Sequence, residues 1–321
     1  MRFERRTWLL IAAFAIVYMV WGSTYLAIRI GLKTLPPLLM AGSRFLVAGS
    51  ILCGLSLARG SAFPSAGQWR RAAVGGVLML AVGNGCVTWA EQFVPSSITA
   101  LLIASEPLWL VLTSWAFFGG QRPGARITAG LAIGLAGVGA LVLPGGGEGD
   151  AGGMMLIGSL AIILAAFSWA VGSLYLREAA LPDSTALSTG MQMLAGGATL
   201  VTLGLLRGEA QTFHAANVSA ASAAAWVYLI VFGSLLGYTA YGWLITATSP
   251  ARLGTYAYVN PVVAVLLGSL VEHEPITAAA WTAMIVILAS VGLVTTGEME
   301  EDEQPEEAES LVFPTPLGEQ A

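Results

Sequence analysis

Two ionisable residues, Arg44 and Glu106, lie deep inside long apolar stretches of the sequence. A charged side chain at the centre of a bilayer costs about 2.5–3.5 kcal/mol on insertion scales, so such a residue is functional or paired by default. Arg44 comes about seven residues after the start of its stretch and Glu106 about nine, which places them within about 3 Å in depth at 1.5 Å per residue. We therefore predict that they form a charge pair, either direct or bridged by water.

Two roles are open for this charge pair. In the structural role, the pair only holds two helices together. In the functional role, a conformational change separates the pair and Glu106 then binds a proton, because a carboxylate separated from both its counter-ion and water favours its neutral form. Removing one partner of such a pair leaves a charge uncompensated, which costs more than removing both.

Aromatic residues follow one face of the first apolar stretch. Phe14, Tyr18, Trp21, Tyr25 and Arg29 are spaced by four, three, four and four residues, which is helical spacing. We predict that Trp21 and Tyr25 face a cavity and that Phe14 packs against neighbouring helices. With polar and aromatic residues of other stretches they form a predicted substrate-binding set: Trp21, Tyr25, Asn84, Glu106, Tyr238, Tyr241, Tyr256 and Asn260.

The elements that must position these residues are membrane-spanning helices. The 321 residues are 56% hydrophobic and only 10% charged, with a mean hydropathy of +0.76, whereas soluble domains carry about 25% charged residues. About 20 apolar residues suffice for one helix to cross the hydrocarbon core. The sequence therefore predicts an all-α membrane protein with ten transmembrane helices, at 8–30, 37–58, 72–90, 97–118, 126–143, 155–176, 185–206, 223–247, 252–272 and 278–296.

The positions of arginine and lysine predict the orientation of these helices, because cytoplasmic loops carry an excess of both. With a cytoplasmic N-terminus, ten of the arginines between the helices and before the first lie inside, and only Lys33 and Arg207 lie outside. We therefore expect a multi-pass inner-membrane protein with both termini in the cytoplasm.

The chain also repeats itself weakly. Gly22-Ser23-Thr24-Tyr25-Leu26 returns as Gly172-Ser173-Leu174-Tyr175-Leu176, and the offset stays between 148 and 155 along the chain. Each copy holds five predicted helices, an odd number, so the second copy must enter the membrane upside down. Inverted repeats are typical of secondary transporters. The expected units are a first repeat at 1–147, a second repeat at 148–297, and a disordered acidic cytoplasmic tail at 298–321.

The repeat aligns charged residues of the first half with neutral amides of the second. Arg44 corresponds to Gln192, and Glu106 corresponds to Asn260; a proline follows both Glu106 and Asn260. Proline frees a carbonyl one turn back and can kink a helix. Glu106 and Asn260 are both expected near the membrane midplane, where a binding site at the repeat interface lies in such transporters.

Five motifs in this order and spacing resemble the EamA family of the drug/metabolite transporter superfamily, and within it the YedA-type inner-membrane permeases. They are Trp21-Gly22-Ser23-Thr24-Tyr25, Pro36-Pro37, Arg44-Phe45, Ala81-Val82-Gly83-Asn84-Gly85, and Tyr256-Ala257-Tyr258-Val259-Asn260-Pro261-Val262. The resemblance covers about residues 7 to 297. It implies two EamA units, a ten-helix exporter and a central cavity between the halves. Members of the wider family move amino acids, pigments, nucleotide-linked metabolites or drugs.

Several other function classes are disfavoured by the residues themselves. An intramembrane protease needs histidines or paired aspartates within the membrane, but both histidines fall near predicted helix ends and every Asp falls in a loop or the tail. We expect no cofactor and no metal, no nucleic-acid partner, and a monomer in the lipid bilayer. The predicted function is a secondary transporter that exports a small organic metabolite, an amino acid or a drug-like compound, by alternating access. A facilitative exchanger or uniporter without ion coupling, and a receptor or sensor, are the alternatives.

Overall fold

In the computed structural model, residues 2–142, 150–248, 253–273, 278, 281–294 and 296–297 are described. Helices dominate these residues, and no strand occurs among them. The labelled elements are α1 (Arg2–Ile16), η1 (Val17–Trp21), α2 (Gly22–Gly31), α3 (Pro37–Ala58), α4 (Ala66–Gly76), η2 (Val77–Asn84), α5 (Gly85–Ala90), α6 (Ser96–Ile103), α7 (Glu106–Phe117), α8 (Ala125–Val142), α9 (Asp150–Glu178), α10 (Thr185–Leu206), α11 (Glu209–Thr212), η4 (Ala215–Asn217), α12 (Ala220–Tyr228), η5 (Leu229–Tyr238), α13 (Thr239–Ala247) and α15 (Tyr256–Glu272).

Within the described residues, an apolar helix lies in each of the ten stretches predicted from the sequence. Seven are long and apolar enough to cross a membrane, and they lie at Arg6–Gly31, Pro37–Ala58, Ala66–Ala90, Ser96–Phe117, Gly153–Glu178, Thr185–Leu206 and Ala220–Ala247. Three shorter apolar helices lie at Ala125–Gly139, Val259–Glu272 and Trp281–Val294. The all-helical membrane class is therefore confirmed. The predicted tail lies outside the described residues.

Four of these helices change their winding partway along. Three contain a stretch of π-helix, namely η1 in the first, η2 in the third and η5 in the eighth. The fourth stops at Ile103 and restarts at Glu106 after a short turn. Pro107 stands at the second position of the restarted helix, where its missing N–H would be unsatisfied in any case. The hydrophobic pattern predicted none of the π-helical stretches, because one extra residue in a turn leaves the apolar run intact.

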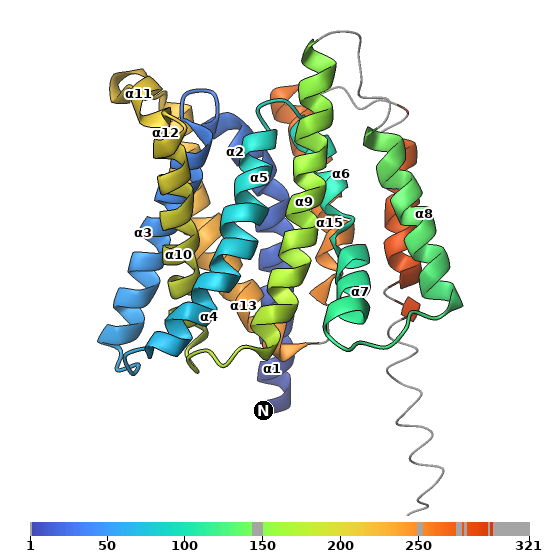
Figure 1. Cartoon of the computed structure of the whole chain (residues 1–321), viewed down its shortest axis with the longest axis horizontal. Coiled ribbons are helices and arrows are strands. Elements are labelled where there is room, and N and C mark those ends of the chain that lie inside the picture. Colours follow the sequence, from blue (N-terminus) through green and yellow to red (C-terminus); the bar gives the residue numbers. More distant parts are fainter. Residues whose placement is uncertain are drawn as a thin grey trace, which may run out of the picture.

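Glycine lets α3 and α10, which are counterparts in the predicted repeat, pack with their backbones close together (left part of Figure 1). A Cβ atom added to Gly42 would lie 2.9 Å from the carbonyl oxygen of Gly197, and one added to Gly49 would lie 2.8 Å from that of Gly190. Small residues permit this close approach in membranes. Contacts of 42 with 197 and of 49 with 190 also mean that the two helices run antiparallel.

A second pair of counterparts packs at the other end of the molecule, where α8 lies beside the helix Trp281–Val294 (right part of Figure 1). Again glycines of one helix contact the other: a Cβ atom on Gly137 would lie 3.1 Å from Ile287, and Gly134 contacts Ser290. Between the two pairs lie the helices that carry most of the predicted site residues.

Many large apolar side chains are exposed on the outer surfaces of the helices. Trp8, Phe117, Leu206 and Leu270 are each more than two-thirds exposed. A soluble monomer rarely exposes contiguous apolar surface on this scale. These side chains are therefore expected to face lipid, whereas the buried residues between the helices form the core.

Candidate functional site

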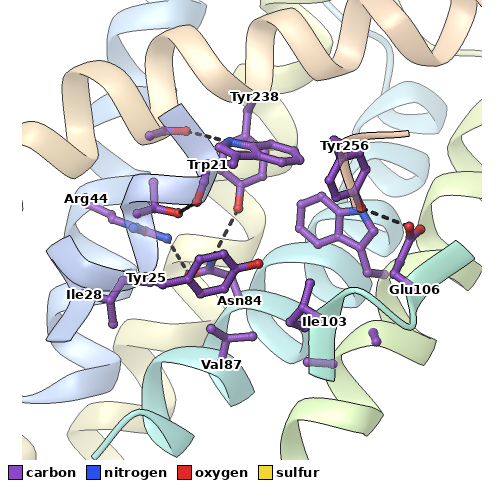
Figure 2. Close-up of a pocket in the computed structure, with 16 residues that line it drawn as sticks. Trp21, Tyr25, Ile28, Arg44, Asn84, Val87, Ile103, Glu106, Tyr238 and Tyr256 are labelled. Carbon is purple, nitrogen blue, oxygen red and sulfur yellow. Dashed lines mark hydrogen bonds between the residues drawn. The ribbon is translucent and has the colours of Figure 1, made fainter. Parts of the chain in front are cut away.

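A cavity of about 70 Å³ lies at the centre of the helices, between elements of both halves of the chain (Figure 2). About 10–15 Å³ is enough for one water molecule by this measure, so the cavity holds a few waters or one small chemical group. The side chains and backbone that line it are Trp21, Thr24, Tyr25, Ile28, Arg44, Gly83, Asn84, Val87, Ile103, Glu106, Ala165, Ala166, Trp169, Gly233, Tyr238 and Tyr256.

One end of the cavity is formed by a chain of hydrogen bonds around Asn84. The guanidinium of Arg44 donates from Nη2 to Oδ1 of Asn84, and the Thr88 hydroxyl donates to the same oxygen over 3.3 Å. The amide Nδ2 of Asn84 donates to the hydroxyl of Tyr238, also over 3.3 Å. Arg44 is 2% exposed. A buried cation is thus fixed in place through a neutral amide.

The other end of the cavity carries the buried carboxyl group of Glu106, which is 1% exposed. Its Oε2 accepts a hydrogen bond of 3.0 Å from the hydroxyl of Tyr256 on α15. Tyr256 is the first residue of α15 and Glu106 the first residue of α7, so the bond joins the starts of two helices.

The two charges of the predicted pair line one cavity but are not in direct contact. Figure 2 shows Arg44 and Glu106 on opposite sides of the site, with the ring of Tyr25 between them. Arg44 takes part in no ion pair within the described part of the chain. The described structure therefore contains no direct ion pair between Arg44 and Glu106. Equal depth along two helices, which the sequence supplied, does not fix the distance across the bundle. Whether they act as a unit through water remains a prediction.

Aromatic rings of Trp21, Trp169 and Tyr238 form one side of the cavity, which we call the aromatic wall. The Trp21 ring lies 5.5 Å from Trp169, 5.1 Å from Tyr238 and 5.8 Å from Tyr256, between ring centroids. Its indole Nε1 donates to the carbonyl of Gly233 over 3.3 Å. Of the predicted binding residues, the structure brings Trp21, Tyr25, Asn84, Glu106, Tyr238 and Tyr256 together here.

Trp169 on α9 was missed by the sequence reasoning. It lines the cavity and donates from Nε1 to the hydroxyl of Tyr241 over 3.0 Å. A signal was present, because a tryptophan precedes the repeated Gly-Ser pair in both copies: Trp21 before Gly22 and Trp169 shortly before Gly172.

The structure places two predicted binding residues, Asn260 and Tyr241, away from the cavity wall. Asn260 is 3% exposed and lies where α2 packs closely on α15: a Cβ atom on Gly22 would be 3.2 Å from the Asn260 carbonyl oxygen. The backbones leave no space for a ligand there. Tyr241, 1% exposed, contacts Ser173 and Trp169 through its hydroxyl behind the aromatic wall.

Tyr241 instead borders a second cavity of about 250 Å³, which we call the vestibule. The vestibule is lined by the connection between α9 and α10 and by the facing sides of α10, η5 and α13, including Arg177, Asp183 and Gln192. Tyr238 lines both cavities. The aromatic wall is thus the boundary between the vestibule and the central cavity.

Four of the residues that line the central cavity lie where a helix is irregular. Trp21 ends η1, Asn84 ends η2 and Tyr238 ends η5, and Glu106 restarts a broken helix. A π-helical turn rotates the side chains beyond it relative to a regular helix, and such turns are frequent at functional sites. Irregular backbone at membrane depth is tolerated where it is buried in protein or lines a cavity.

Two comparisons with known proteins show the family and the fold of the chain. The model of the EamA-like transporter family matches residues 7–143 and 156–296. A solved crystal structure shares the fold, with a TM-score of 0.63 and 22% identity, over 91% of this chain and 98% of that one.

Curated relatives of similar length match along nearly the whole chain. The inner membrane transporter YedA of Escherichia coli K12 is 42% identical over 93% of this chain and 94% of its own. The transporter YvbV of Bacillus subtilis is 25% identical over 91% and 92%, respectively. A protein of E. coli K12 named as a probable amino-acid metabolite efflux pump is 23% identical over 86% and 91%. With two family matches that together span most of its length, the chain belongs to the EamA-like transporter family.

Proposed function

We propose that this protein is a secondary transporter that exports a small organic metabolite, an amino acid or a drug-like compound, across the inner membrane by alternating access. The observation that carries the proposal is the central cavity, which is buried, lined by aromatic rings and bounded by a cation and a carboxyl group. A few convergent polar groups in an otherwise apolar, aromatic cavity are typical of a small-molecule site.

The proposed architecture is ten transmembrane helices arranged as two inverted repeats, 1–147 and 148–297. Reciprocal packing of α3 and α10 supports it. The repeat equates Gly42 with Gly190 and Gly49 with Gly197, and the contacts join Gly42 to Gly197 and Gly49 to Gly190. In such a reciprocal contact, each glycine of one helix meets the counterpart of the other glycine. This pattern is expected when a two-fold axis relates the two helices.

The π-helical stretches give the repeat further support. η2 begins at Val77 and η5 begins at Leu229, an offset of 152 that falls within the range of the sequence repeat. With both termini in the cytoplasm, the vestibule would open toward the cytoplasm, because it is lined by the connection between α9 and α10. The structure then corresponds to a state that receives substrate from inside. We expect the unit to work as a monomer.

The direct test is export from cells and vesicles. We expect that overproduction raises the tolerance of cells to at least one compound in a panel of amino acids and toxic metabolites, and that deletion lowers it. Everted vesicles that contain the protein should accumulate the same compound. A panel in which no compound distinguishes vesicles with the protein from empty vesicles would contradict the transporter proposal.

Proton coupling separates the main proposal from facilitated exchange. If Glu106 binds a proton from outside during each cycle, export should become faster as the external pH falls from about 8.5 to about 5.5, and Glu106→Gln should abolish this dependence. A flat profile in the wild type, with Glu106→Gln exporting at the wild-type rate, would instead favour an exchanger or uniporter without ion coupling.

A further inference from the structure

Arg44 is a buried cation that has no direct ion-pair partner among the described residues. It is 2% exposed, and its hydrogen bond to Asn84 engages a neutral amide. Arg44 has no carboxylate oxygen within 4.0 Å in the part of the chain that the structure describes. The acidic residues on neighbouring elements, Glu91 beyond Asn84 and Glu106 across the cavity, therefore act on it only at longer range.

This arrangement is costly unless another charge completes it. Buried charges in proteins are normally paired or fully hydrogen-bonded. Within a membrane, arginine is expected to face a cavity and to find a partner there. Arg44 does line the central cavity, and its Nε is buried and has no hydrogen-bond partner.

A carboxylate matches the hydrogen-bond donor that Arg44 still offers. Arginine binds carboxylates through two parallel N–H donors, which adds both strength and geometric specificity. Nη2 already contacts Asn84, whereas Nε remains as a donor on the same planar group. The cavity volume of about 70 Å³ accommodates a group of a few heavy atoms beside the guanidinium.

We propose that Arg44 is the anion-binding residue of the central cavity and that the substrates of this protein carry a carboxylate. The inference rests on the proposed transport function and specifies its substrate class. Asn84 is the positioning residue, because Thr88 and Tyr238 hold its amide while its Oδ1 holds the guanidinium. The aromatic wall at Trp21 and Tyr238 then receives the uncharged body of the substrate.

Thermal unfolding of the purified protein with matched probes tests this proposal. Acetate, butyrate and phenylacetate are each compared with their amides, and sodium chloride is added to the amide samples so that both have the same ionic strength. A ligand that binds only the folded state stabilises it by RT ln(1 + L/Kd), where L is the free ligand concentration, and therefore raises Tm. We expect at least one carboxylate to raise Tm above the effect of its amide. If none does, the proposal is overturned. A larger rise with phenylmethanesulfonate than with phenylacetate would overturn the assignment to carboxylates.

Variants of Arg44 test whether this residue causes the preference for carboxylates over amides. Arg44→Gln should remove the difference between carboxylate and amide, and Arg44→Lys, which keeps the charge but loses the planar fork, should weaken carboxylate binding by about tenfold or more. Arg29→Gln is the matched control, since Arg29 donates to the backbone carbonyl of Glu91 and does not line the cavity. If Arg44→Gln does not fold, Arg44→Lys carries the test. An unchanged carboxylate preference in a folded Arg44 variant would overturn the proposal.

The outcomes for this site and for transport are distinguishable. Liposomes that transport a neutral or cationic compound, without any preference for carboxylates in the unfolding assay, would overturn the anion site and leave the transporter in place. Carboxylate-dependent stabilisation that requires Arg44, without flux of labelled phenylacetate into the same liposomes, would support the site and count against transport of that compound.

Discussion

Arg44 in α3 and Gln192 in α10 occupy equivalent places in the two halves. Each lies between the two glycines through which its helix packs closely on the other. Arg44 is buried in the central cavity, whereas Gln192 is half-buried at the vestibule. Close backbone packing needs a small residue on both sides of the contact, so it is shared by the halves. A substrate has no two-fold symmetry, so one charged site is sufficient and the second half can carry neutral groups.

Glu106 and Asn260 show the same contrast in a second pair of helices. Glu106 lines the cavity and accepts a hydrogen bond from Tyr256, whereas Asn260 lies beneath the contact with Gly22, and its Oδ1 has no hydrogen-bond partner in the described structure. Equivalent sequence positions therefore do not have equivalent surroundings. The surroundings of Glu106 and Asn260 differ because the two halves differ in conformation or in role. The substitutions below test how the two halves differ.

The largest effect is expected when the charged half is made like the neutral half. Arg44→Gln should lower the export rate by about 10- to 100-fold, because a hydrogen bond to a charged group is worth about 1.5–3 kcal/mol. Gln192→Met, which removes the polar group at the equivalent position of the other half, should lower the export rate clearly less. Initial rates in vesicles with equal amounts of protein measure both. Equal losses would show that the halves do not differ in chemistry.

Next in size is a change in the packing that the halves share. Gly42→Ala places a Cβ atom 2.7 Å from Val201 and 2.9 Å from the Gly197 carbonyl. Overpacking of this kind costs about 1–3 kcal/mol, so Tm in detergent should fall. Gly54→Ala in the same helix is the control, since nothing lies within 4 Å of the added atom. A Tm for Gly42→Ala equal to that of Gly54→Ala would contradict the close packing.

A smaller effect is expected at the boundary between vestibule and cavity. Tyr241→Phe removes the hydroxyl that contacts Trp169 and Ser173, at about 0.5–1.5 kcal/mol per hydrogen bond. The aromatic wall should loosen, and a cysteine at Ala166, in a background without Cys53 and Cys86, should react faster with a polar thiol reagent from the vestibule side. Unchanged labelling would show that the wall does not limit access.

The smallest effect is expected at an exposed contact between the halves. Lys33 and Glu272 form an ion pair of 2.8 Å, with the lysine side chain more than half exposed. Pairs of this kind are worth about 0–1 kcal/mol and are screened by salt. Lys33→Met should therefore change Tm and export little, and the small difference should vanish in high salt. A large loss of activity would give this contact a role in holding one conformation.

The sequence by itself determined the elements and the class of the protein. Apolar runs are local in the chain, so within the described residues each of the ten stretches contains an apolar helix, seven of which are long enough to cross a membrane. Ionisable residues within such runs are conspicuous for the same reason, and Arg44 and Glu106 both line the cavity. Family membership also followed from motifs that are contiguous in the sequence.

Only the tertiary structure decided which of these residues meet. The rise of 1.5 Å per residue gives the depth of a side chain, but not its direction around the helix or its distance across the bundle. Direction depends on π-helical turns at Trp21, Asn84 and Tyr238, and distance depends on glycine contacts such as that between Gly42 and Gly197. Packing between helices distant in the sequence thus gave Arg44 the amide of Asn84 as its partner instead of the carboxylate of Glu106.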